Sequence, residues 1–512
     1  MSKPTLFQLR LVSRQLGDIA QRWAYRSLRL EGHGSSAERF AKIAYSPKLR
    51  DLVWELTIDT WIGPGFAYHS NEGYKIPEAF MNNLPHLRCF GNLKVLHLRF
   101  SEYCGEDDDD RSGLALEETW NFRYRVLDTI CHCVAGMWTK ERQVQIDKRM
   151  EQEWEPGYSY PDEDSSLPSG QVIHLKELTI TNLADYHEPA LSEAWKKVIT
   201  LPSLIDLKLL VTTESCDPAP ENSIYFKERY EFFENLPRSW LSPAVANNLR
   251  VLSLYYGDYW GWFPKMDFRS LALGQDSPFP HLKVLALGNY VFSHEWQVEW
   301  LASIGRDNSS GGLEELYLDD CPVLFKARQV GPFSSSDPGY PDPKAVLGPN
   351  YNPETREYPM RWNHILIRWA ESMKGLKVFR MGHGTWYGVP DDTLMAIKYD
   401  GSYDGVSSDV REHHASHQLH RSFACPAPID EDDDEDAELV WKAGRHLHGA
   451  GMKESRGWQM QYIEYDIGLG PTQWIEPRRP YDGPFAPEDG TLAKDDAAFK
   501  ALMTAIEARA SA

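Results

Sequence analysis

The feature that most constrains the fold is a repeated spacing of apolar residues, which is clearest in Leu282-Lys283-Val284-Leu285-Ala286-Leu287. Its first, fourth and sixth positions are apolar, and the fourth and sixth alternate with polar or small residues. A period of two is typical of a short strand that buries one face. The same spacing recurs at Val53/Leu56/Ile58, Leu93/Leu96/Leu98, Leu175/Leu178/Ile180, Leu204/Leu207/Leu209, Leu249/Leu252/Leu254, Leu313/Leu316/Leu318 and, in weaker form, Leu376/Phe379/Met381. Because the spacing occurs eight times, it predicts a strand unit that is repeated along the chain.

Segments with apolar residues three and four positions apart lie between these strands and predict helices. They are residues 123–137, 191–199, 227–236, 294–304, 361–373 and 437–446. The strand spacing is that of the leucine-rich repeat, LxxLxL, and Leu313 to Cys321 also has the cysteine variant of the ninth position. The predicted fold class is therefore α/β, a leucine-rich-repeat solenoid with parallel strands on its concave face and helices on its convex face.

The spacing between copies is uneven, so the solenoid predicted over residues 46–470 is irregular. Its insertions are rich in Pro, Gly, Ser or Asp, and we expect them near residues 101–170, 213–240, 326–358 and 388–438. Gln461 to Asp466 alternates like one more strand, which could close the sheet. Residues 471–490 are typical of a Pro/Gly-rich linker. Residues 491–512 predict an amphipathic helix that either caps the sheet or binds a partner.

The N-terminal residues 5–30 have apolar side chains at helical spacing and predict a helix. Within them, Leu9–Arg14 (LRLVSR) and Tyr25–Leu28 (YRSL) resemble the C-terminal half of an F-box. The next two segments, residues 37–43 and 49–58, are similar to the helix and first strand of fungal F-box proteins. Residues 1–45 are thus expected to form a partial F-box-like segment. The family's Leu-Pro-x-Glu segment and first helix do not precede it, so we expect a misassigned start or a lost adaptor.

The resemblance implies a function, because F-box proteins hold a target protein and present it to a Skp/cullin ubiquitin ligase. They catalyse nothing themselves, and this chain is expected to be a substrate receptor and not an enzyme. Its expected partners are a Skp-type adaptor and an unidentified target protein. By resemblance, the adaptor-binding residues are Leu6, Leu9, Leu11 and Val12. The alternative is a repeat scaffold without a ligase connection, in which the N-terminal helices only cap the sheet.

Target binding is expected at strand positions on the concave face, where aromatic and arginine side chains supply much of the binding energy of protein interfaces. These residues are His97, Arg99, Thr179, Lys208, Tyr255, Trp260, Tyr317, Asp319 and Arg380. Trp260 belongs to an aromatic and glycine-rich stretch that begins at Tyr255 and ends at Phe263. Its rings either pack beneath a loop or face the ligand.

Charge and cysteine content narrow the partners and the compartment. A formal charge of −21 argues against nucleic acid, which needs a basic surface. The seven scattered cysteines indicate reduced thiols in the cytoplasm or nucleus, and no apolar run is long enough to span a membrane. Neither a catalytic motif nor a cofactor site is predicted. His413, His417 and His420 could share a helical face and hold zinc, but a polar surface segment is preferred and no metal site is predicted.

Overall fold

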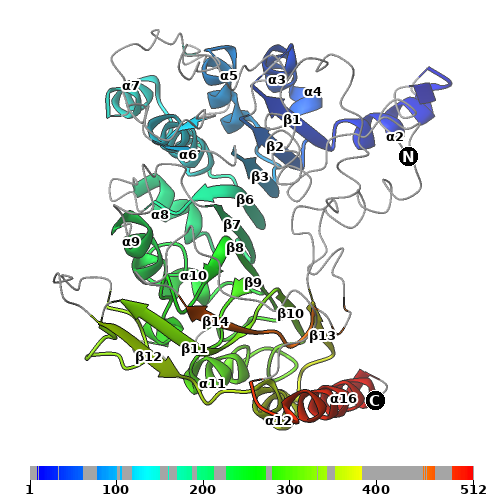
Figure 1. The fold of residues 1–512 in the computed structure, drawn as a ribbon. Helices are drawn as coiled ribbons and strands as arrows, with labels where there is room; N and C mark the ends of the chain where they lie inside the picture. Colours follow the sequence, from blue (N-terminus) through cyan, green and yellow to red (C-terminus); the bar gives the residue numbers. More distant parts are fainter. Residues whose placement is uncertain are drawn as a thin grey trace, which may run out of the picture. The chain divides into compact units, whose positions relative to one another are not determined.

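The computed structural model describes residues 8–9, 11–32, 34–60, 78–100, 104–105, 118–149, 160, 170–186, 193–212, 227–272, 279–330, 332–342, 352–382, 454, 456, 458–466 and 487–510. The chain divides into two compact units. Unit 1 comprises Met1–Asn182 and Glu188–Asp206, and unit 2 comprises Leu183–His187 and Leu207–Ala512. The order of strands in the main sheet is β1-β2-β3-β6-β7-β8-β9-β10-β13, so the strands of this sheet are arranged in their order along the chain (Figure 1).

Unit 1 is built on four parallel strands with helices. The strands are β1 (Ser27–Glu31), β2 (Glu55–Asp59), β3 (Val95–Arg99) and β6 (Glu177–Ala184), and a short pair is formed by β4 (Cys104–Gly105) and β5 (Glu118–Thr119). The helices are α2 (Arg14–Ala24), α3 (Ser36–Tyr45), α4 (Pro47–Arg50), α5 (Glu78–Asn83), α6 (Trp120–Val134), α7 (Lys140–Arg149), α8 (Glu193–Ile199) and the 3-10 helix η1 (Leu84–Cys89). The register places Leu56 beside Leu96 and Leu96 beside Leu178, so equivalent leucines stack across the sheet.

Unit 2 combines parallel strands with a second, smaller sheet. Its main-sheet strands are β7 (Asp206–Thr212), β8 (Val251–Trp260), β9 (Val284–Tyr290), β10 (Glu315–Asp319) and β13 (Val378–Gly382). The small sheet has the order β12-β11-β14, from β11 (Val323–Val330), β12 (Pro353–Glu357) and β14 (Tyr462–Asp466). The helices are α9 (Lys227–Asn235), α10 (Pro243–Ala246), α11 (Glu295–Ser303), α12 (Trp362–Ser372), α16 (Thr491–Ala510) and the 3-10 helix η2 (Phe268–Ala272).

The prediction of a leucine-rich-repeat solenoid is wrong. The structure is an α/β arrangement, in which a large parallel sheet is combined with helices. A solenoid would leave the polar positions of its strands on an open inner surface, yet every residue of β2 and of β3 is buried. Strands buried on both faces are typical of parallel sheets in α/β proteins. The apolar spacing identified the strands but did not show that the opposite face is covered too.

Several local predictions need correction. The N-terminal helix is shorter than residues 5–30, since α2 ends at Ala24 and, after a two-residue turn, the strand β1 begins at Ser27. The predicted insertion at residues 326–358 contains most of β11 and all of β12, which pair antiparallel. The strand predicted at Gln461 to Asp466 exists, but it pairs with β11 in the small sheet and does not close the main one. The predicted helix at residues 437–446 lies outside the described residues.

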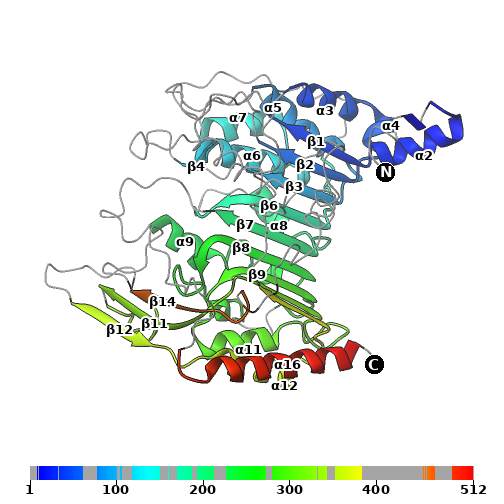
Figure 2. The same cartoon turned by 45° about the vertical axis from the view of Figure 1, so that its right-hand side comes forward.

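Two apolar clusters hold unit 2 together. The leucines of the repeated pattern that lie in unit 2 are buried, and Leu285 and Leu316 have no exposed surface. An aromatic cluster centred on Trp262 and Tyr465 fills the space around the small sheet, and their rings stack with centroids 4.8 Å apart. The C-terminal helix α16 lies along α12 (Figures 1 and 2) and buries Leu502 and Ile506. This packing favours the cap over the partner-binding helix among the two roles predicted for residues 491–512.

Candidate protein-binding surface

The helix α2 carries large apolar side chains that face solvent. In the part of the chain that the structure describes, five of the nine exposed large apolar residues lie in or just before this helix. They are Leu11 (89% exposed), Val12 (68%), Leu16 (40%), Ile19 (53%) and Trp23 (58%). Leu16, Ile19 and Trp23 are spaced by three and four positions, which places them on one side of α2, and the exposed Val12 comes just before the N-cap Ser13. We call these four residues the α2 stripe.

The buried positions of α2 are small residues. Ala20 and Ala24 are the buried residues of the helix, whereas its largest apolar side chains are exposed. Figures 1 and 2 show α2 extending away from β1, at the outer side of unit 1. A cluster of exposed apolar side chains in a globular protein is typical of a binding site.

Local sequence explains why α2 begins and ends where it does. Ser13 is the N-cap, and its side-chain oxygen accepts a hydrogen bond of 3.2 Å from the backbone N–H of Leu16. Arg22 lies in the last turn, where a positive charge interacts favourably with the helix dipole. The N–H of Tyr25 closes the helix on the carbonyl of Gln21 at 3.1 Å. The helix is therefore defined by its own caps and does not need a partner to end it.

Backbone hydrogen bonds fix the segment after α2 to the sheet. The carbonyl of Arg26 accepts hydrogen bonds from the N–H groups of Trp54 and Glu55, at 2.9 and 3.0 Å. The side chain of Arg26 lies over two indole rings, with its guanidinium carbon 5.5 Å from the ring centroid of Trp23 and 4.4 Å from that of Trp54. The end of the α2 stripe is thus joined to the residue that precedes β2.

The adaptor-binding residues predicted from the sequence differ in their exposure in the structure. Leu11 and Val12 are exposed, as a docking role requires, and Leu9 is partly exposed. Leu6 lies outside the described residues. Sequence reasoning did not name Leu16, Ile19 and Trp23 as site residues, although their spacing of three and four positions was the signal that could have found them.

The predicted concave-face residues of unit 1 are buried. His97, Arg99 and Thr179 belong to β3 and β6 and have almost no exposed surface. Arg99 has a guanidinium nitrogen 3.5 Å from the carboxylate of Asp59, and His97 lies 4.0 Å from the carboxylate of Glu55. The prediction that these side chains are exposed is wrong, because both faces of the strands are covered.

Most of the predicted concave-face residues of unit 2 are buried as well, so their predicted exposure is also wrong. The buried ones are Lys208, Tyr255, Trp260, Tyr317 and Asp319, whereas Arg380 is partly exposed and pairs with Glu454. The Trp260 indole N–H donates to the carbonyl of Gly288 at 2.7 Å, so this ring is part of the core and not of a ligand-facing patch. The hydroxyl of Tyr317 donates to Glu315 at 2.7 Å, and burial raises the pKa of Tyr317 above its ordinary range. That these residues bind a target stays a prediction without test.

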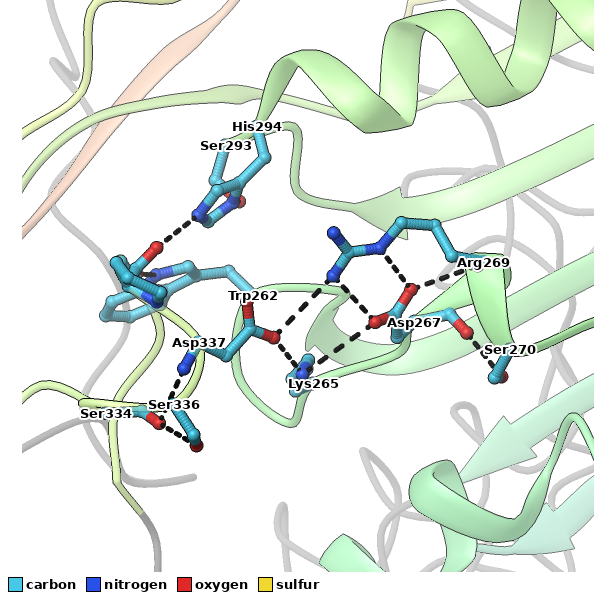
Figure 3. A network of polar contacts seen from close by, with 12 residues as sticks. Trp262, Lys265, Asp267, Arg269, Ser270, Ser293, His294, Ser334, Ser336 and Asp337 are labelled. Carbon is cyan, nitrogen blue, oxygen red and sulfur yellow. Dashed lines mark hydrogen bonds and ion pairs between the residues drawn. The ribbon is translucent and has the colours of Figure 1, made fainter.

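A polar cluster in unit 2 was not foreseen from the sequence, and Figure 3 shows it. Asp267 binds Arg269 through both carboxylate oxygens, at 2.9 and 2.8 Å, and Lys265 pairs with Asp337. The guanidinium of Arg269 lies 3.7 Å from Asp337 and links the two pairs. Although it is partly buried, Asp267 has a pKa below its ordinary value because Arg269 and Lys265 stabilise the charged form. These residues hold the turn around Asp337 against the loop that comes after β8.

His294 completes this cluster from the start of α11. Its Nδ1 lies 2.8 Å from the Ser293 hydroxyl, and its Nε2 lies 3.2 Å from the carbonyl of Pro338 (Figure 3). Since a carbonyl only accepts, Nε2 carries the proton and Nδ1 accepts from Ser293. Burial lowers the pKa of His294, and the neutral ring stacks on Tyr340 with centroids 4.3 Å apart. Because Ser293 is buried, we interpret this pair as a structural contact that holds the turn around Asp337, and not as a nucleophile with its base.

The described residues contain no group of three or more His, Cys, Asp or Glu side chains arranged to hold a metal ion. The predicted candidates His413, His417 and His420 lie outside them. Cys131 and Cys133 are free and buried, and burial raises the pKa of the Cys133 thiol to about 12. Both thiols are therefore protonated at neutral pH. Among the described helices, none combines the length and the apolar character needed to cross a bilayer.

Comparison with known proteins gives no match, since no family model fits the chain and no curated protein is similar to it. The F-box resemblance consequently depends on the residues of the N-terminal segment alone.

Proposed function

We propose that this chain is a protein-interaction module that binds a partner protein through the α2 stripe. The observation that carries the proposal is the exposure of Leu16, Ile19 and Trp23 on one side of a well-capped helix. Moving such side chains from water into an interface contributes roughly 1.5 to 3 kcal/mol for each residue fully buried. A stripe of four could therefore provide the centre of an interface.

The class of partner comes from the resemblance of the N-terminal segment to an F-box. On that ground the partner is a Skp-type adaptor, and the module would act as a receptor that brings a target protein to the adaptor. The residues in contact with the adaptor would be Leu11 and Val12, which the resemblance names, and the remainder of the α2 stripe. The module has no catalytic role in this proposal.

The alternative role for the N-terminal segment is a cap over the end of the sheet. A cap covers apolar surface with its own large apolar side chains. In α2 the buried positions are Ala20 and Ala24, while Ile19 and Trp23 are more than half exposed. This distribution supports docking over capping, although β1 itself does cover the edge of β2.

Binding of the full chain to a recombinant Skp-type adaptor tests the proposal. Ile19→Asp places a charge in the middle of the stripe and should abolish capture of the adaptor with little change in melting temperature, because the side chain is already exposed. Ile367→Asp is the matched control, since Ile367 is a similarly exposed isoleucine on α12. Capture that survives Ile19→Asp, or that is lost equally with the control, would rule out the α2 stripe as the docking site.

A further inference from the structure

We propose that Arg26 recognises a carboxylate of the partner, so that the surface opposite the α2 stripe is acidic as well as apolar. This inference rests on the proposed function, and it adds the chemistry that the partner must present. Arg26 is placed at the end of the stripe next to Trp23, and it is exposed.

The guanidinium of Arg26 is held in position before any partner arrives. Both indole centroids, of Trp23 and Trp54, lie within the distance of about 6 Å at which a cation is attracted to an aromatic face. The backbone of Arg26 is fixed as well, by its two hydrogen bonds from Trp54 and Glu55. A side chain that is already ordered loses less conformational entropy when it binds.

Contacts with the indole rings leave the edge of the guanidinium available. Its five N–H donors lie in the plane of the group, and they match the two oxygens of a carboxylate. Among the residues that the structure describes, none is seen to form a hydrogen bond or an ion pair with the guanidinium of Arg26. Arg29, three residues later, shows the contrast, since it is already paired with Asp59 and Glu31.

The charge of the whole segment supports an acidic partner. Residues 1–30 contain six cationic residues and one acidic residue, which gives +5 in a chain whose formal charge is −21. The six are Lys3, Arg10, Arg14, Arg22, Arg26 and Arg29, and the acid is Asp18. Arg22 lies three positions after Ile19 and so is beside the stripe. A positive segment in an acidic protein attracts acidic surfaces that the remainder of the chain repels.

An anionic lipid surface would also attract this segment. Lipid binding, however, needs only mobile point charges and a long apolar face, whereas α2 has 11 residues and is followed by Arg26, whose guanidinium lies over two indole rings. A fixed and directional donor group is suited to a protein carboxylate. We therefore assign the surface to an acidic protein, and vesicles serve as the competing arm of the test.

The test measures the Kd of the full chain for a recombinant Skp-type adaptor at low and at high salt. Arg26→Gln should weaken binding about tenfold at low salt, because a hydrogen-bonded ion pair is replaced by a neutral contact. Arg26→Lys should be intermediate, since it keeps the charge but not the planar donor group. Arg39→Gln, on the exposed side of α3, is the control and should leave the Kd unchanged. High salt should reduce the difference between wild type and Arg26→Gln.

The outcomes separate the two proposals. If the adaptor binds, Ile19→Asp prevents it, and neither Arg26→Gln nor salt alters the Kd, then the docking site stands and carboxylate recognition is wrong. If the adaptor does not bind at all, both proposals fail. If instead vesicles containing phosphatidylserine bind the chain and Arg26→Gln releases it, the surface is a lipid-binding one and the acidic protein partner is overturned. A melting curve for each variant verifies that the fold is intact.

Discussion

The carboxylate of Asp495 accepts two hydrogen bonds from Asn363, one from the backbone N–H and one from the side-chain amide, each 2.8 Å long. Its other oxygen accepts from the hydroxyl of Tyr462 at 2.8 Å. Asp495 belongs to α16, and Asn363 lies in the first turn of α12, whose N-terminal N–H groups have no partner within the helix. At the other end Arg509 donates to the carbonyls of Met373 and Ala370. The C-terminal helix thus satisfies both ends of α12.

Removing the Asp495 carboxylate should destabilise unit 2. Asp495→Ala leaves the buried amide of Asn363 and the hydroxyl of Tyr462 without their acceptor, which costs about 3 kcal/mol or more. Chemical denaturation monitored by tryptophan fluorescence measures the change. Asp489→Asn, an exposed acid just before the same helix, is the control and should alter the free energy of unfolding by less than about 0.5 kcal/mol. Equal stability of the two variants would refute this role of Asp495.

Gly288 is predicted to be irreplaceable because of Tyr255 on the neighbouring strand. The two residues are register partners of β9 and β8, and a Cβ on Gly288 would lie 1.8 Å from the Tyr255 ring. Gly288→Ala should therefore lower the melting temperature strongly, and adding Tyr255→Ala should restore part of the loss. Gly257→Ala, where the nearest atom is 3.8 Å away, should be tolerated. Tolerance of Gly288→Ala alone would show that the two strands are not in this register.

Trp260 should behave as a core residue. Its ring meets Tyr290 edge to face, with centroids 4.9 Å apart, and is almost completely buried. Trp260→Ala should cost about 3 to 5 kcal/mol of unfolding free energy, which is the usual range for removing a buried aromatic ring. Equilibrium denaturation gives the value. A variant with unchanged stability and impaired partner binding would return Trp260 to the ligand-facing role.

His86 should make unit 1 less stable in mild acid. Burial lowers the pKa of His86 to about 4 from 6.5, with Arg88 adding to the effect and the Asn83 carbonyl opposing it. The unfolded chain binds the proton near pH 6.5 and the folded chain only near pH 4. The contribution of neutral His86 to the free energy of unfolding is therefore complete above pH 6.5 and is lost as the pH falls toward 4. The full effect is about 3 kcal/mol.

Thermal melts between neutral pH and pH 4 measure this dependence. His86→Gln cannot take up the proton in this range, so its stability should fall less steeply than that of the wild type over the same interval. His364→Gln, at an exposed position of α12, should keep the wild-type slope. Identical slopes for wild type and His86→Gln would exclude His86 as the titrating group.

The sequence located the strands because burial of one strand face leaves a period of two. Leu56, Leu96 and Leu285 all lie in strands and are all buried. The class of fold was wrong because the alternating polar positions carry no sign of what covers them. His97 and Arg99 have the polarity of a solvent-facing wall, yet they are buried beside Glu55 and Asp59. A buried charge that is compensated by a partner on the next strand cannot be distinguished by periodicity from an exposed one.

The candidate site was predicted only in part for a similar reason. Helical spacing shows that Leu16, Ile19 and Trp23 share a side, but a helix normally turns such a side inward. That α2 buries Ala20 and Ala24 instead depends on which residues cover the helix, and the spacing of its own residues carries no information on that. The polar cluster around Asp337 and His294 was missed because its members come from three separate segments of unit 2 with no shared motif.

Hydrogen–deuterium exchange of the full chain, with and without a Skp-type adaptor, tests the central claim most directly. Exchange is slowed where a partner covers and stabilises backbone amides. Binding through the α2 stripe predicts that the adaptor protects the amides of residues 14–24 and leaves those of α12 and α16 unchanged. Adaptor binding that leaves residues 14–24 unprotected, or no binding at saturating adaptor, would contradict the account.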